Sequence, residues 1–175
     1  MNFYANIIES KGPVIGDSYF FQTKEEITEW LKDMRIENYT INNDLTVDID
    51  GLVDLTFKYL KKIPVKFNEI RGKFGCGYNQ LISLKGSPEI VGSGDNGGFG
   101  CNNNQLNSLK YCPKIINGNF YCNSNELISL IDLPIIKGNY RVGISNNPIK
   151  TLKGLKNISA NLLIGLLKFY SNLDW

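Results

Sequence analysis

The sequence predicts an α/β-type repeat solenoid with one short parallel β-sheet and irregular or 3₁₀ return segments, closed at its N-terminal end by a helix and a hairpin. Three observations lead to this prediction. Three stretches are nearly identical: FGCGYNQLISL from Phe74, FGCNNNQLNSL from Phe99 and FYCNSNELISL from Phe120. Their cysteines, asparagines, leucines and prolines recur in one register, and glycines and prolines punctuate each return.

The register predicts five repeat units between residues 51 and 160. The interval from Cys76 to Cys101 exceeds that from Cys101 to Cys122, and the extra residues fall within GSGDNGG. Lys58 occupies the asparagine position of the first unit, as a terminal repeat allows. The units are 51–71, 72–97, 98–117, 118–139 and 140–160.

Each unit shares the frame Φ-x-Φ-x-x-N-x-L-x-x-L, where Φ is Phe, Val, Cys, Leu or Ile. The Φ-x-Φ step has a period of two, which places both side chains on one face of a strand. The recurrent asparagine suits a turn, where its amide can bond backbone groups that would otherwise be buried unpaired. Stacked units of this kind bury one continuous core.

The two ends are predicted to differ from the repeats. Residues 1–50 form the predicted cap, with an amphipathic helix at about 24–35 and a hairpin at about 39–50. Thr23 and Glu26 make a capping box at the start of the helix. Residues 161–175 are expected to form a C-terminal cap or a degenerate repeat, or an apolar edge that pairs with a second copy of the chain.

Composition limits the chemistry that the chain can perform. It contains no histidine, which removes the usual general base and the commonest transition-metal ligand. We therefore expect no enzymatic activity. The start lacks the pattern of a signal peptide, and no apolar stretch is long enough to cross a bilayer, so we expect no membrane association and a cytoplasmic location with reduced cysteines.

The repeated cysteines are predicted to be core residues rather than a metal or redox site. Their position is taken by Leu55 in the first unit and Ile144 in the fifth, and buried free cysteine behaves as a small hydrophobe. Their spacing lacks the CxxC pairs of zinc sites. The motif GSGDNG from Gly92 resembles a dinucleotide loop but precedes a strand, so it is interpreted as a protruding loop. No metal and no cofactor are expected.

The repeats resemble the short leucine-rich repeats of bacteriophage and bacterial proteins, whose units follow F-x-C-x-x-N-x-L-x-S-L-x-G-x-P. The resemblance covers about residues 36–157. It implies protein–protein interaction rather than catalysis. In a phage setting it implies a protein that acts in the host cytoplasm, where it binds and inhibits a host or defence protein.

The candidate binding residues are those predicted to point outward from the sheet or to lie on the inserted loop. Most outward positions are glycine or amide residues, which leaves Tyr121 as a large anchor. The predicted partner-binding residues are Tyr78, Asp95, Asn96, Asn102, Asn119, Tyr121, Asn123 and Arg141.

Nucleic-acid binding is the alternative function. Residues 1–54 contain 4 basic and 11 acidic residues, whereas residues 55–175 contain 15 basic and 6 acidic residues. Lys85, Lys110 and Lys153 recur at one repeat position and could form a basic ridge. The chain lacks the interleaved aromatic and basic residues of single-strand binders, so protein recognition is favoured.

Overall fold

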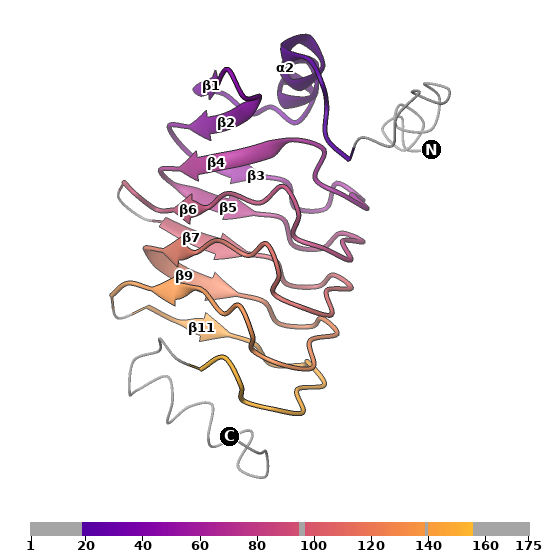
Figure 1. Ribbon diagram of the computed structural model, residues 1–175, viewed down its shortest axis with the longest axis vertical. Coiled ribbons are helices and arrows are strands. Elements are labelled where there is room, and N and C mark those ends of the chain that lie inside the picture. The colour runs from indigo at the N-terminus through magenta and orange to yellow at the C-terminus, as the bar shows by residue number, and fades with distance from the viewer. Residues whose placement is uncertain (1–18, 95–96, 139, 156–175) are drawn as a thin grey trace.

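The computed structural model describes residues 19–94, 97–138 and 140–155, and over these it is a parallel β-solenoid of about five turns. The turns stack along the long axis of the molecule, with the helix at the N-terminal end (Figure 1). Each turn contributes a strand to two separate sheets, sheet A with six strands and sheet B with five.

Sheet B contains the strands that the Φ-x-Φ pattern predicted. It comprises β3 (Val53–Asp54), β5 (Lys73–Gly75), β7 (Gly97–Gly100), β9 (Gly118–Tyr121) and β11 (Val142–Gly143), in the order β11-β9-β7-β5-β3. All four pairings are parallel. Phe74 pairs with Phe99, and Phe99 pairs with Phe120, so the repeat register read from the sequence is the register of the sheet.

The prediction of a single sheet with irregular or 3₁₀ returns was wrong. Apart from the hairpin strands β1 and β2, sheet A is built by the return segments, and the described residues contain no 3₁₀ turn. Its order is β1-β2-β4-β6-β8-β10, and its strands are β1 (Tyr39–Ile41), β2 (Thr46–Ile49), β4 (Lys66–Ile70), β6 (Ile90–Val91), β8 (Ile115–Ile116) and β10 (Ile135–Ile136). The last three are pairs of β-branched residues that begin one or two residues after the prolines Pro88, Pro113 and Pro134. β-branched side chains favour the extended backbone.

The N-terminal end of the solenoid is covered by a helix and a hairpin. Helix α2 (Lys24–Asp33) begins at the capping box of Thr23 and Glu26 and buries Ile27, Trp30 and Leu31. The Trp30 ring lies 6.4 Å from that of Phe67 in β4. Strands β1 and β2 pair antiparallel, and β2 then pairs in parallel with β4, which joins the hairpin to the repeat stack.

The core is a set of ladders with one residue per turn. The Phe74 and Phe99 rings stack 5.5 Å apart, and Phe99 and Phe120 stack 6.2 Å apart. The cysteine position forms a parallel ladder of fully buried side chains, continued by aliphatic residues at both ends. Its members are Leu55, Cys76, Cys101, Cys122 and Ile144.

Asparagine side chains join each turn to the one before it. Asn104 Nδ2 donates to the carbonyls of Cys76 in the preceding turn and Cys101 in its own turn, at 3.0 and 3.1 Å, and its Oδ1 accepts from the Leu81 amide at 3.0 Å. Equivalent bonds are made by Asn79, Asn125 and Asn147. We call these four residues the asparagine ladder.

Replacing a member of the asparagine ladder should therefore destabilise the fold. Asn104→Ala leaves two carbonyls and one amide without this partner, and each unsatisfied buried group costs about 1–3 kcal/mol. We expect the free energy of unfolding in urea to fall by about 3 kcal/mol or more. Asn107→Ala, at an exposed position of the same turn, is the control and should change it by less than about 0.5 kcal/mol. Equal effects of the two substitutions would contradict the role assigned to the ladder.

Candidate functional site

The outer face of sheet B carries a row of five residues, three of them glycine, which we call the glycine row. Strand register places Asp54, Gly75, Gly100, Tyr121 and Gly143 in this row, one from each strand. A Cβ added at Gly75 would lie 3.4 Å from its nearest neighbour, Thr56 Cγ2, and one added at Gly100 would lie 3.7 Å from Asn102 Oδ1. Neither glycine has a φ in the left-handed region. The fold therefore has room for a Cβ at both positions.

Tyr121 is half-buried because its ring lies against the next turn. A Cβ at Gly143 would come within 3.0 Å of Tyr121 Cδ1 and 2.6 Å of Asn123 Oδ1. Gly143 therefore makes space for these two side chains, in contrast to Gly75 and Gly100.

Two of the predicted binding asparagines have structural partners. Asn119 Oδ1 accepts from the Arg141 amide at 2.9 Å, and Asn123 Oδ1 accepts from the Ser145 amide at 3.1 Å. These bonds tie β9 to the following turn beyond the short strand pairing. Arg141 is exposed and Asn102 is half-buried on the same face.

Tyr78 lies at the corner where the chain leaves sheet B. It is 47% exposed, and its ring stacks on that of Phe57 from the previous turn, with centroids 4.3 Å apart and planes inclined by 18°. Sequence reasoning identified Tyr78 but missed Phe57. The signal was present, because Phe57 follows Leu55 by the same interval that separates Tyr78 from Cys76.

This corner position has a left-handed backbone in every turn. Its φ is 55° at Phe57 and Tyr78 and 56° at Asn103, Ser124 and Asn146. Asparagine tolerates this region, whereas a bulky side chain there costs about 1–2 kcal/mol. The first two turns thus carry large exposed aromatic residues at a position where the later turns have small polar ones.

Two further predicted sites cannot be placed. Asp95 and Asn96, at the tip of the inserted loop, lie outside the described residues, as does the C-terminal segment that was predicted to cap the solenoid or to pair with a second copy. The flanking Gly94 is described, and its amide donates to the Arg71 carbonyl at 3.0 Å.

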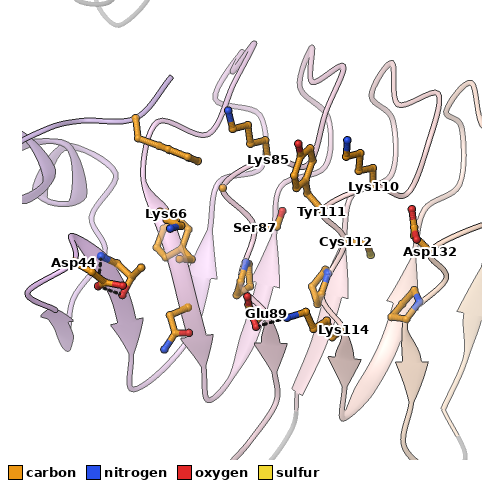
Figure 2. A pocket seen from close by; sticks show the side chains of 18 of the residues that line it. Asp44, Lys66, Lys85, Ser87, Glu89, Lys110, Tyr111, Cys112, Lys114 and Asp132 are labelled. Carbon is orange, nitrogen blue, oxygen red and sulfur yellow. Dashed lines mark hydrogen bonds and ion pairs between the residues drawn. The ribbon is translucent and has the colours of Figure 1, made fainter. Parts of the chain in front are cut away.

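A groove of about 820 Å³ crosses sheet A, and sequence reasoning missed it because sheet A was not predicted. Figure 2 shows Lys85, Tyr111 and Lys110 along its loop side and the Glu89–Lys114 ion pair over the strands. Lys85 Nζ lies 4.6 Å from the centroid of Tyr19, and Lys110 Nζ lies 5.2 Å from that of Tyr111. Lys153, the third residue of the predicted basic ridge, is exposed but does not line the groove.

The cysteines are arranged for packing. In the described part of the chain, no group of three or more potential ligands is placed to hold a metal ion. Burial raises the pKa of Cys76 and Cys101, and that of Cys112, which borders the sheet A groove. A raised pKa keeps these thiols protonated at neutral pH, and the protonated thiol is a poor nucleophile.

No family model matches the chain, and no curated protein or solved structure matches it significantly. Among the described residues, no helix combines the length and the apolar character needed to span a membrane.

The burial of the cysteines predicts low thiol reactivity in the folded protein. We expect a thiol-specific reagent at pH 8 to label Cys76, Cys101 and Cys122 only after unfolding, and Cys112 slowly, with a rate that still rises above pH 9. Mass spectrometry of the labelled peptides distinguishes the four sites. Rapid labelling of a ladder cysteine in the native state would contradict the placement of these residues in the core.

Proposed function

We propose that this protein is a non-catalytic recognition module that binds another protein through the outer face of sheet B. Its repeat frame supports assignment to the leucine-rich-repeat type, for which protein binding is the implied role. Extended sheet faces of solenoids commonly serve as binding surfaces. The same resemblance supports a phage origin, action in the host cytoplasm and inhibition of a host or defence protein.

The observation that carries the proposal is the pair Gly75 and Gly100. A glycine inside a strand weakens it by roughly 0.5–1 kcal/mol relative to alanine, and such glycines often mark close approach of a ligand or another backbone. Gly75 and Gly100 pair directly and have room for a Cβ, so internal packing does not require them. A partner that contacts the bare strands accounts for both glycines. Tyr121, which pairs with Gly100 on the next strand and is half-buried, offers an aromatic anchor in the same row.

Nucleic-acid binding is the second candidate, and the groove over sheet A is the observation that favours it. Lys66, Lys85 and Lys110 line this groove together with Tyr111. The acidic residues Asp44, Glu89 and Asp132 line it too, and Glu89 lies 2.7 Å from Lys114. A phosphate backbone would meet these carboxylates, which makes the groove the weaker candidate.

Adding a side chain in the glycine row should weaken binding of the partner without destabilising the fold. For Gly100→Val we expect a free energy of unfolding that is unchanged or raised by up to about 1 kcal/mol, because the Cβ has room and valine favours strands. Affinity for the partner should fall at least about 10-fold, which is about 1.4 kcal/mol. Ile135→Ala, on the outer face of sheet A, is the control and should leave affinity unchanged.

To obtain the partner for this measurement, the wild-type protein is used as bait in nuclease-treated host lysate. The captured protein is then purified, and its affinity is measured by calorimetric titration. Recovery of nucleic acid alone from an untreated lysate, with an affinity that falls steeply with salt, would overturn the proposal in favour of the groove. Equal affinities of Gly100→Val and wild type for the partner would exclude the outer face of sheet B as the binding surface.

A further inference from the structure

Three aromatic residues project from one corner of the first two turns, and the fold makes little use of them. Phe57 is 64% exposed, Tyr59 67% and Tyr78 47%. All three have a left-handed backbone, with φ of 55°, 57° and 55°. We call these residues the aromatic corner. Large residues in this conformation persist only where the surrounding structure holds them, and they concentrate at functional sites.

The aromatic corner is held rigidly by the repeat stack. The Phe57 amide donates to the Gly77 carbonyl at 3.3 Å, and the Tyr78 amide donates to the Asn102 carbonyl at 2.9 Å. Asn79 Oδ1 accepts from the amides of Lys58 and Leu60, at 3.0 and 2.9 Å. The residues on both sides of Tyr59 are therefore fixed by one asparagine of the ladder. Little conformational entropy remains to be lost when this corner binds, so the corner is preorganised.

Two lysines lie close to the aromatic corner in the sequence. Lys58 lies between Phe57 and Tyr59, and Lys61 is exposed close by in the sequence. Within the described ranges, neither lysine forms an ion pair; the two ion pairs found there are Arg71 with Asp50 and Lys114 with Glu89. These two lysines are thus available to carboxylates of a partner.

We infer that the aromatic corner is an anchor that inserts into an apolar, acid-rimmed pocket of the partner protein. The inference rests on the proposed function and extends the binding surface past the edge of sheet B, since Phe57 and Tyr78 directly follow Thr56 and Gly77 of that face. Projecting aromatic side chains that fill a partner's pocket dominate binding energy in many interfaces. The Phe57 and Tyr78 rings already stack on each other, so the pair presents a single apolar surface. No space is left between the two rings into which a nucleic-acid base could insert.

The chain supplies a substitution that should preserve the fold. Asparagine stands at the same corner position in later turns as Asn103 and Asn146, with the same left-handed φ. We therefore expect the double variant Phe57→Asn/Tyr78→Asn to fold with at least the thermal stability of the wild type. The matched control is Tyr111→Asn, which removes a tyrosine that is also 47% exposed and left-handed, with φ 68°, but borders the sheet A groove.

The experiment uses the full chain as bait in nuclease-treated host lysate and then measures the affinity of the purified, captured protein by calorimetry. We expect the double variant to bind it at least about 30-fold more weakly than the wild type, and Tyr111→Asn to bind it equally well. Replacing an acidic residue at the rim of the partner's pocket by lysine should weaken binding to the wild-type protein at least about 5-fold.

Each outcome bears on a different statement. Capture of a partner whose affinity is insensitive to Phe57→Asn/Tyr78→Asn but falls with Gly100→Val would overturn the aromatic corner and leave the sheet B proposal standing. Absence of any captured protein, or capture of nucleic acid only, would overturn both. Loss of binding in Tyr111→Asn of the same size as in the double variant would also exclude the corner as a specific anchor.

Discussion

The asparagine ladder is the interaction on which the rest of the structure depends. A solenoid with strands of two to five residues leaves many backbone groups at its corners without partners in either sheet. The carboxamide meets this need because it offers both a donor and an acceptor. Asn125, itself buried, donates to the carbonyls of Cys101 and Cys122 and accepts from the Leu106 amide. Aspartate would lose the donor and leucine would lose both, so a polar residue at this inner position stabilises the fold more than an apolar one.

The direction of the ladder explains an irregularity of the sequence. Each asparagine reaches back to the preceding turn, as Asn79 does to the Leu55 carbonyl and the Leu60 amide. The first unit has the helix and hairpin before it rather than another repeat, and it carries Lys58 at this position. The residue just before each asparagine has a left-handed backbone, and Tyr78 before Asn79 is the clearest case. Each ladder asparagine and the left-handed residue before it therefore belong to the same corner of the solenoid.

The sequence could predict what recurs in every unit with a fixed period. The inner positions, from Phe74 to Phe120 and from Cys76 to Cys122, fall in the register read from the repeat, as does the asparagine position. Sheet A was missed because a pair such as Ile115–Ile116 is too short to display a period of two. Phe57 was missed for a different reason. It occupies the repeat position of Tyr78, but an aromatic residue at an exposed left-handed corner follows no propensity rule, so the stacking of the two rings became evident only from the structure.

The left-handed corners also separate positions set by the fold from positions that are free to serve recognition. A second corner recurs at Gly86, Tyr111, Asp132 and Gly154, all with positive φ. Gly86 is required there, because a Cβ would lie 2.7 Å from the Val65 carbonyl oxygen. At the first corner the later turns have asparagine or serine, which suit the backbone, whereas the first two turns have aromatic residues that do not. Since backbone geometry accounts for Asn103 but not for Phe57 or Tyr78, this departure from the local rule supports the proposed contact with a partner.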